Sequence, residues 1–252
     1  MPVRAPASPS LASRPLTLPA FERDTVSESA TVLGRKWLSV VPFRSILELT
    51  DTEVAAGLHV RTLCAGSDDF CADCGDASPF GHDEVCPGRA PITLGRHEQV
   101  KRLVNNTLSS NSKFRVVLES LVPGTQLRTD LRIAGPDGVK EIDITIVSLA
   151  SKDGRTLSAR AHSDTSLSVF DRSRNAVKDV LSEAARNKTL KYGWRVAAPF
   201  RPFVLGSGGA VEPSTLKLFE AWREVLAPSA YSHFARVLSL VLLRSRSKLA
   251  RV

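Results

Sequence analysis

The sequence lacks a long hydrophobic run, and it lacks acidic residues at its start. Its longest apolar candidate, LSLVLL at residues 238–243, is far shorter than the roughly 18 residues that a membrane-spanning helix needs, so no membrane partner is expected. The first twenty residues, MPVRAPASPSLASRPLTLPA, contain five prolines, two arginines and no acid. This composition predicts a disordered leader over residues 1–20. A transit peptide is the alternative, but proline at this density opposes the amphipathic helix that such peptides form.

Basic residues are absent from a second stretch, Cys64 to Cys86, which carries six acidic residues. From Pro87 onward the balance reverses, with 27 basic and 14 acidic residues, and the whole chain has a net charge of +8. A region with this excess of basic residues favours a polyanionic partner, either DNA or RNA. A generic solvated basic surface is the alternative. The hydrophobic fraction of 42% and the charged fraction of 24% are ordinary for a globular protein with a substantial core.

Cysteine is scarce, and three of the four cysteines stand close to a histidine. Cys71, Cys74, His82 and Cys86 form the pattern C-x2-C-x7-H-x3-C. Structural zinc is bound by four Cys or His ligands in a tetrahedron. A C-x2-C turn supplies two thiolates, and glycine and proline lie between the two ligand pairs, where the chain must reverse. The pattern therefore predicts a structural zinc site.

A disulfide pair or free thiols are the alternatives to zinc. We recognise no signal peptide, so we expect a reducing compartment, which disfavours a disulfide. The six carboxylates would repel a phosphate backbone, and we therefore interpret the finger as a brace that orients its neighbours. Cys64 is left over, and we expect it to be a buried apolar thiol and not a fifth ligand.

The remaining sequence has the periodicity of an α/β domain. Thr50 or Asp51 can cap a helix within a helical linker region at 21–65. Apolar spacing then predicts a helix, three strands, a helix and one or two further strands, at 94–108, 114–119, 128–133, 140–149, 173–192 and 194–206. Two more helices are predicted over 213–247. We therefore expect a zinc module at 66–93, an α/β domain with a mixed sheet at 94–226, and a C-terminal helix with a basic tail at 227–252.

The loop GPDG, residues 135–138, joins two predicted strands into a hairpin. Antiparallel pairing around this loop puts Leu131 opposite Ile142 and Asp130 opposite Asp143, with side-chain carbons about 5 Å apart. Facing like charges destabilise a sheet unless a cation lies between them, and a hard ion such as Mg²⁺ takes oxygen ligands. The pair predicts a magnesium site. A solvated polar face is the alternative, and a one-residue slip in register would separate the two aspartates.

Several short motifs follow one another along the chain: the finger, Arg96-His97, Glu119, Arg128-Thr129-Asp130, residues 143–148 (DITIVS) and residues 188–192 (KTLKY). In this order they resemble the C-terminal region of non-LTR retrotransposon polyproteins, in which a CCHC zinc finger precedes a restriction-like endonuclease of the PD-(D/E)xK superfamily. Residues 35–64 resemble the linker that follows the reverse transcriptase in such proteins. The resemblance covers roughly residues 35–226, and it implies a restriction-endonuclease-like core.

The resemblance also implies roles for the carboxylates. Asp130 matches the first metal-binding aspartate and Asp143 the second, with Glu119 as a further carboxylate, and together they would bind Mg²⁺. Two residues depart from the family pattern. Thr129 stands where the family usually has proline, which changes the entry into the strand. Thr145 stands two residues after the second acid, where the common superfamily pattern has lysine.

In the retrotransposon branch a lysine on the following helix replaces that missing lysine. The resemblance places this role on Lys191, with Lys188 as the alternative; the lysine would orient the nucleophile or offset the charge that develops on oxygen. Tyr192 completes the Lys-Tyr pair of the family. It would position Lys191 or the phosphate, or it is an ordinary core tyrosine. If neither lysine reaches the two aspartates, the activity is in doubt.

The resemblance therefore implies an endonuclease with structural zinc and catalytic magnesium that nicks chromosomal DNA to prime reverse transcription. Its partners would be DNA and element RNA, and its location the nucleus, or the cytoplasm if it is inactive. No aromatic-x-Asp-Asp motif occurs, so a polymerase would belong to a partner or to a missing upstream domain. The alternatives are a catalytically inactive, zinc-containing DNA-binding remnant and a zinc-braced interaction protein with no nucleic-acid role.

Overall fold

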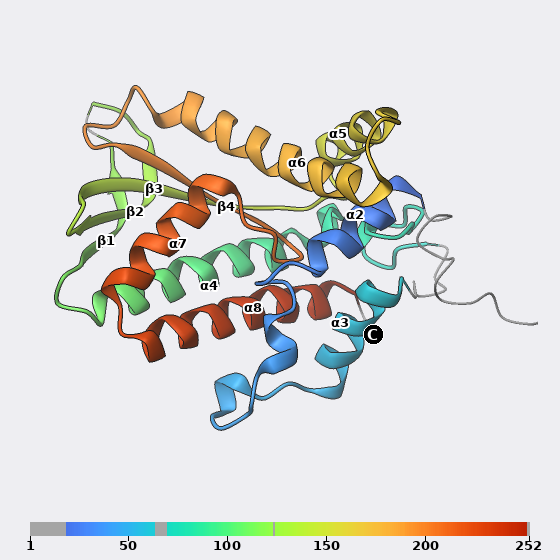
Figure 1. The fold of residues 1–252 in the computed structure, drawn as a ribbon, viewed down its shortest axis with the longest axis horizontal. Coiled ribbons are helices and arrows are strands. Elements are labelled where there is room, and N and C mark those ends of the chain that lie inside the picture. Colours follow the sequence, from blue (N-terminus) through green and yellow to red (C-terminus); the bar gives the residue numbers. More distant parts are fainter. Residues whose placement is uncertain (1–18, 64–69, 123, 251–252) are drawn as a thin grey trace, which may run out of the picture.

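The computed structural model describes residues 19–63, 70–122 and 124–250. Most of the predicted leader and Cys64 lie outside these ranges. The described residues form seven α-helices and four strands (Figure 1). In chain order these elements are α2 (Ala20–Ser29), α3 (Asp51–Thr62), α4 (Ala90–Ser109), β1 (Arg115–Leu121), β2 (Arg128–Gly135), β3 (Gly138–Val147), α5 (Lys152–Ser163), α6 (Val169–Tyr192), β4 (Phe200–Gly206), α7 (Pro213–Val225) and α8 (Pro228–Ala250).

The strands form a single mixed sheet in the order β1-β2-β3-β4. The first two pairs are antiparallel, and β3 and β4 are parallel. The predicted mixed α/β class is therefore confirmed, as is the order of α4, three strands, α6 and β4. One helix, α5, was not predicted, and the segment 194–206 forms one strand.

The β2–β3 hairpin has the predicted register. Leu131 pairs with Ile142, and Ala134 pairs with Val139. The ladder continues through Gly135 and Gly138, so the connecting loop has two residues and is shorter than the predicted GPDG loop. Gly138 has a φ of 89°, a left-handed conformation that glycine adopts at little cost and that tight hairpins require.

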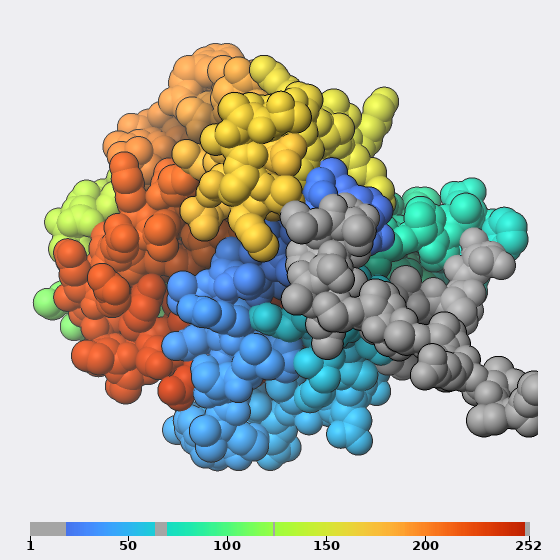
Figure 2. Space-filling view, turned by 45° about the vertical axis from the view of Figure 1, so that its right-hand side comes forward, coloured from blue at the N-terminus to red at the C-terminus, as the bar shows by residue number. Residues whose placement is uncertain are grey.

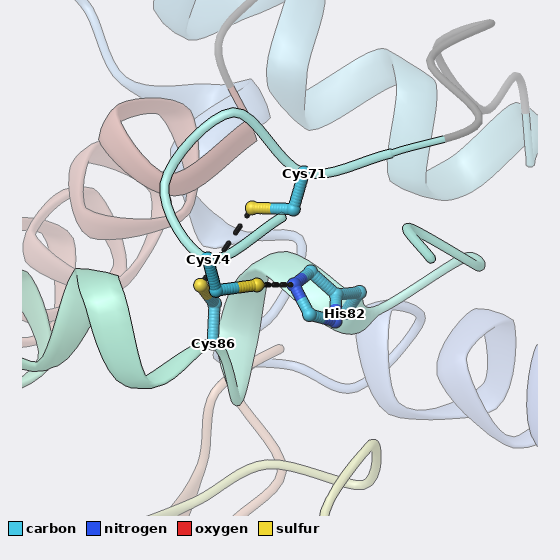
Figure 3. Close-up of side chains that lie close together, drawn as sticks. All are labelled: Cys71, Cys74, His82 and Cys86. Carbon is cyan, nitrogen blue, oxygen red and sulfur yellow. Dashed lines mark hydrogen bonds between the residues drawn. The ribbon is translucent and has the colours of Figure 1, made fainter. Parts of the chain in front are cut away.

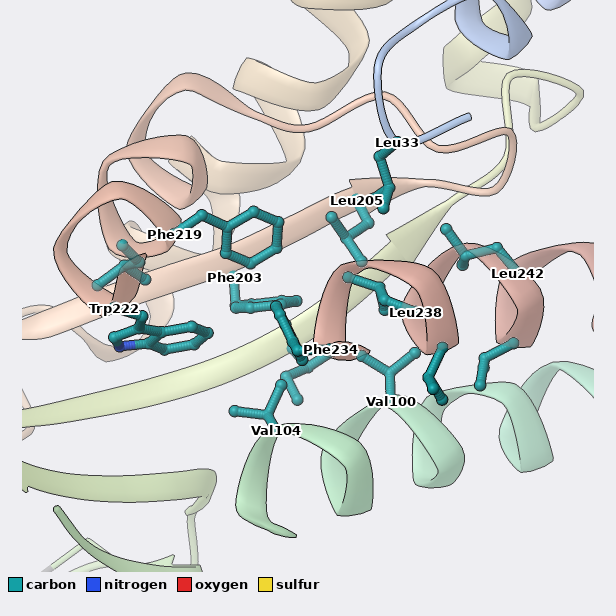
Figure 4. Packing of buried hydrophobic residues seen from close by; sticks show 14 of the residues in the cluster. Leu33, Val100, Val104, Phe203, Leu205, Phe219, Trp222, Phe234, Leu238 and Leu242 are labelled. Atoms are coloured by element: carbon teal, nitrogen blue, oxygen red, sulfur yellow. The ribbon is translucent and has the colours of Figure 1, made fainter. Parts of the chain in front are cut away.

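Helices cover both faces of the sheet (Figure 1). On one face α4, α7 and α8 enclose the main core with β2, β3 and β4. The labelled side chains of Figure 4 show how α8 enters this core: Phe234 and Leu238 lie between Val100 of α4 and Phe203 of β4. On the other face α6 packs on β4 through a smaller apolar cluster. The predicted C-terminal helix thus lies inside the α/β core.

The local signals for two predicted helices are clear in the structure. Thr50 caps α3 in a capping box, in which its side chain accepts from the backbone N–H of Glu53 and the Glu53 carboxylate accepts from the N–H of Thr50. Helix α6 begins after the cap Ser168, a few residues before its predicted start at Ser173, and ends at Tyr192. Gly193 follows, as the sequence predicted.

Within the ranges that the structure describes, none of the helices combines the length and the hydropathy that crossing a bilayer requires.

Candidate functional site

Four potential metal ligands converge in the segment before α4 (Figure 3). The ligand atoms of Cys71, Cys74, His82 and Cys86 all lie within 4.8 Å of one another. The Sγ atoms of Cys71 and Cys86 are 3.7 Å apart, and Cys74 Sγ is 3.3 Å from His82 Nε2. Two sulfurs bound to one tetrahedral zinc ion are about 3.8 Å apart. The cluster could therefore hold a metal ion such as zinc.

The backbone between the ligands explains how they meet. Gly75 and Gly81 both have φ near 80°, at 78° and 85°, which lets the chain turn after Cys74 and before His82. The backbone N–H of Asp73 donates to Cys71 and lowers the pKa of this thiol to about 6. A thiol with a lowered pKa is more readily the thiolate that metals bind. No disulfide joins the three cysteines that the structure describes.

Glu84 fastens the cysteine segment (residues 71–89) to the α/β core. One carboxylate oxygen accepts from the hydroxyls of Ser148 and Ser207, each at 2.6 Å, and the other pairs with Arg246 of α8 at 2.6 Å. Burial acts to raise the pKa of Glu84, but Arg246 and the two hydroxyls outweigh it and lower the pKa. Glu84 is therefore a largely buried anion, with a side chain 12% exposed, that ties three parts of the chain together.

Arg89 makes a second fastening. Its guanidinium pairs with Asp73 and Asp83 and also donates to the carbonyl oxygen of Leu249 in α8. Three of the six acidic residues between Cys64 and Cys86 are therefore in ion pairs within the protein. These contacts support the interpretation of the segment as a brace.

The segment also contacts α2 and α5. Phe80 lies edge-on to Phe21 of α2, with ring centroids 5.9 Å apart, and Arg155 of α5 stacks over Phe21 and donates to the carbonyl of Phe80. Figure 2 shows the surface of the segment, in teal, beside the yellow surface of α5 and the blue surface of α2.

The second candidate site lies where β2 and β3 separate. The last pair of their ladder on this side is Leu131 with Ile142, and the next residue on each strand is an aspartate. Asp130 accepts from the backbone N–H of Ile144 at 2.7 Å and contacts His97 Nε2 of α4 at 3.0 Å. Burial acts to raise the pKa of Asp130, but these two contacts outweigh it and lower the pKa.

Asp143 is covered by α6 and is only 5% exposed. Its carboxylate lies 2.6 Å from the Nζ atom of Lys188. Burial raises the pKa of Asp143; Lys188 opposes this effect, and the charge of Asp130 adds to it. The two aspartates are therefore close enough to repel each other, and the alternative of a solvated polar face is wrong for Asp143.

The two candidate lysines differ in their contacts with the aspartates. Lys188 contacts Asp143, whereas Lys191 is exposed and lies over the ring of Tyr192, with its Nζ 4.9 Å from the centroid. Tyr192 is buried, stacks on Phe200 and donates to the carbonyl of Arg128 at 3.3 Å. Burial and then the charge of Asp143 raise the pKa of Tyr192 to about 12. Tyr192 is thus both a packed aromatic residue and a neighbour of the aspartates.

Glu119 lies at the rim of this cluster. Its carboxylate pairs with Lys101 of α4 at 3.0 Å and with Arg128 at 3.5 Å. Its φ of 51° is left-handed, which is uncommon for a residue with a side chain. Hydrogen bonding to Lys101 lowers the pKa of Glu119. The predicted third carboxylate is thus ionised, strained and near Asp130.

Two basic residues of α4 belong to the cluster and had no role in the site predicted from sequence. His97 contacts Asp130, and Lys101 bridges Glu98 and Glu119. Their spacing of four residues puts both on one face of a helix. This spacing is the sequence signal from which the two residues could have been predicted. Thr129, which the resemblance aligns with a proline, donates to the buried Glu141 at 2.6 Å.

The chain matches no protein-family model, and a search of curated proteins returns no significantly similar sequence.

Proposed function

We propose that this chain is a metal-dependent DNA endonuclease domain braced by a structural zinc ion. One observation carries the proposal: Asp130 and Asp143 lie on the neighbouring strands β2 and β3, next to the last pair of their ladder, and Lys188 of α6 lies 2.6 Å from Asp143. Two carboxylates and an amine in this arrangement suit phosphodiester hydrolysis, because the carboxylates can bind a divalent cation and the amine can offset the charge of the phosphate.

The donor set suits magnesium. Mg²⁺ prefers oxygen ligands and is commonly bound by one or two carboxylates together with substrate phosphates. Burial raises the pKa of Asp143 and the charge of Asp130 adds to this rise; a bound cation would relieve the repulsion between the two carboxylates. Asp130, Asp143 and, at the rim, Glu119 would hold the ion. Bound Mg²⁺ supplies Lewis acidity that lowers the pKa of a nucleophilic water and offsets charge on the phosphate.

The chain's own residues have distinct parts in this mechanism. Lys188, in place of the Lys191 expected from sequence, orients the water or neutralises the oxygen that gains charge. Its position depends on α6, which lies across the sheet face that carries Asp143. His97 and the N–H of Ile144 hold the Asp130 carboxylate in one orientation. Tyr192 is buried and borders Asp143.

The resemblance to non-LTR retrotransposon endonucleases supports the finer parts of the proposal. The element order α4, β1, β2, β3, α5, α6, β4 supports the proposal of a restriction-endonuclease-like core, with α5 as an addition to the order expected from the resemblance. On this view the nick primes reverse transcription in the nucleus, and a polymerase on a partner or upstream domain uses the new 3′ end. Element RNA would then be a second nucleic-acid partner.

The test is a nicking assay on supercoiled plasmid with and without Mg²⁺. We expect Mg²⁺-dependent nicking that Asp143→Asn lowers by at least about 100-fold. Asp137→Asn is the matched control, because Asp137 lies in the loop of the same hairpin and is exposed. Equal nicking by the Asp143 and Asp137 variants would refute the site.

The metal of the Cys/His cluster needs a separate test. We propose zinc, because three thiolates and one imidazole are typical of structural zinc sites. Elemental analysis of the purified chain should give one zinc per chain, and Cys74→Ser should lose it. Cys64→Ser, the control, should keep it, since four ligands are already present without Cys64. Zinc retained by the Cys74 variant would contradict the assignment.

A second function is favoured by the ion pairs themselves. Asp143 already contacts Lys188, and Asp130 already contacts His97, so the carboxylates are neutralised without a metal. A catalytically inactive, zinc-containing DNA-binding remnant would have this arrangement. It predicts salt-sensitive DNA binding with no Mg²⁺-dependent nicking, a result that the two assays together would identify.

A further inference from the structure

An exposed tryptophan stands just beyond the end of α6. Trp194 is 74% exposed, and Leu190, one turn earlier, is 64% exposed. The other two tryptophans, Trp37 and Trp222, are buried. Tryptophan has a large apolar surface, so an exposed one often marks an interaction site.

The indole ring of Trp194 is held in place. Its Nε1 donates to the carbonyl of Leu190 at 3.2 Å, and the guanidinium of Arg195 lies 4.4 Å from the ring centroid. The backbone N–H of Arg195 donates to the carbonyl of Tyr192 at 2.8 Å. An ordered aromatic ring loses little conformational entropy when a flat ligand stacks on it.

The surroundings of Trp194 are basic. Residues 184–211 carry five basic residues and no acid. Four of these basic residues are exposed: Arg186, which pairs with Glu183 at 3.1 Å, and Lys191, Arg195 and Arg201. A basic surface with an exposed aromatic ring fits a nucleic acid, because phosphates pair with the cations and bases stack on the ring.

This surface adjoins the proposed site. Tyr192 is two residues before Trp194 in the sequence, and its phenol lies close enough to Asp143 for the carboxylate to affect its pKa. In Figure 1 the end of α6 and its connection to β4 lie beside the end of the sheet where β2 and β3 are labelled. Trp194 therefore follows, two residues later in the chain, a side chain that borders Asp143.

We propose that Trp194 stacks on an unpaired base next to the scissile phosphate, with Lys191 and Arg195 contacting the flanking phosphates. Within a perfect duplex each base face is covered by its neighbours, so a free face requires an unpaired or displaced base. The substrate class is thus DNA with unpaired bases, such as a bubble or a single-stranded flank. This inference rests on the proposed function and narrows its substrate.

The experiment measures binding of the full-length, zinc-loaded chain without added Mg²⁺, so that cleavage plays no part. The probes are a fluorescein-labelled single strand, the perfect duplex and the same duplex with a short unpaired bubble. We expect the wild type to prefer the single strand and the bubble, and Trp194→Ala to weaken these two complexes about tenfold with little effect on the duplex. Trp194→Phe, which keeps an aromatic face, should retain binding within about threefold.

Two further readouts separate stacking from a general effect. Phe170→Ala, at the other end of α6, removes a similarly exposed ring (69%) and should leave binding unchanged. Tryptophan fluorescence should be quenched by the single strand in the wild type and in Phe170→Ala, but not in Trp194→Phe. Undiminished binding by Trp194→Ala, or equal affinity for duplex and bubble, would overturn the inference even if Asp143-dependent nicking is observed. If Asp143→Asn nicks normally while Trp194→Ala loses binding, the nuclease proposal fails and the stacking surface remains.

Discussion

Lys188 and Lys191 lie less than one turn apart on α6, yet their surroundings differ. Lys188 lies on the side of the helix that covers the sheet and contacts Asp143, whereas Lys191 is exposed beside Tyr192. A three-residue step on a helix rotates a side chain by roughly 60° from its original direction. That rotation is sufficient to separate a lysine in the proposed site from one at its rim.

The two lysines should therefore respond differently to substitution. Lys188→Ala removes the amine from Asp143 and is expected to lower the plasmid nicking rate about 100-fold, as the loss of one charge-stabilising group does in other enzymes. Lys191→Ala should lower it less than about fivefold, mainly through weaker DNA binding. Initial rates over a range of DNA concentrations measure both variants, because weaker binding raises KM whereas loss of the amine from Asp143 lowers kcat. A larger loss for Lys191→Ala than for Lys188→Ala would return the catalytic role to Lys191.

Glu28 is another residue whose burial has consequences. It is fully buried in α2, near Arg246 and the anion Glu84. Burial raises the pKa of Glu28 to about 7, with Arg246 opposing the shift. The close fit depends on Gly206, because a Cβ at that position would collide with the Glu28 carboxylate.

A raised pKa makes the protonated form of Glu28 the one that favours folding. Its stabilising contribution is complete below the unfolded-state value of about 4.5 and is lost as the pH rises through about 7. Glu28→Gln cannot ionise, so between pH 5 and pH 8 the free energy of unfolding of the variant should rise relative to wild type by as much as about 3 kcal/mol. Urea unfolding of both proteins at the two pH values measures this. An unchanged difference would contradict the assignment.

The cysteine segment illustrates how short elements are held without a large core of their own. Its two 3-10 turns, η3 (His82–Glu84) and η4 (Pro87–Arg89), present Glu84 and Arg89 to the C-terminal part of α8. A metal ion would fix the ligands relative to one another, and these two side chains fix the whole segment relative to the sheet. Half of the acidic residues between Cys64 and Cys86 are thus used for ion pairs within the protein.

Arg89→Ala should test this docking. It leaves Asp73, Asp83 and the Leu249 carbonyl without their guanidinium partner, and the two aspartates are partly exposed. We expect a loss of about 2–4 kcal/mol in the free energy of unfolding with zinc content unchanged. Arg102→Ala, on the exposed side of α4, should change it by less than about 0.5 kcal/mol. Equal effects of the two substitutions in urea unfolding would show that the docking contributes nothing.

Helix α5 shows why one element was missed. Its buried positions are Gly154 and Ser158, so it has no apolar stripe from which to predict a helix. It is anchored by polar contacts instead: Ser158 donates to Asp24, and His162 Nε2 lies 2.7 Å from the same carboxylate. Such contacts join residues far apart in the chain and leave no periodic trace in the sequence.

The core of the whole molecule depends on its last helix. Helix α8 lies along α4 and under the sheet, and Phe234 contacts the rings of Phe219 and Trp222 at centroid distances of 5.5 and 6.0 Å. The segment RSRSKLARV, predicted as a basic tail, largely continues this helix, with Arg246 buried in ion pairs. The C-terminal residues are therefore part of the fold that positions both candidate sites.

Phe234→Ala is expected to cost about 3–5 kcal/mol of unfolding free energy, because it leaves a cavity where α8 meets α7 and the sheet. Phe170→Ala removes an exposed ring and should cost less than about 0.5 kcal/mol. Chemical denaturation of the zinc-loaded proteins compares them. A small effect of the Phe234 substitution would mean that α8 is not essential to the core.

Spacing and alternation in the sequence were sufficient to predict the Cys/His cluster, the mixed α/β class and the hairpin register, although the ladder ends one pair before the predicted partners Asp130 and Asp143. These features depend on residues that are near in sequence or joined by a short turn, so local geometry specifies them. The choice between Lys188 and Lys191, the recruitment of His97 and Lys101, and the docking of the cysteine segment on α8 depend on how helices pack across the sheet. That packing is set by many distant apolar contacts acting together, and no short stretch of sequence records it.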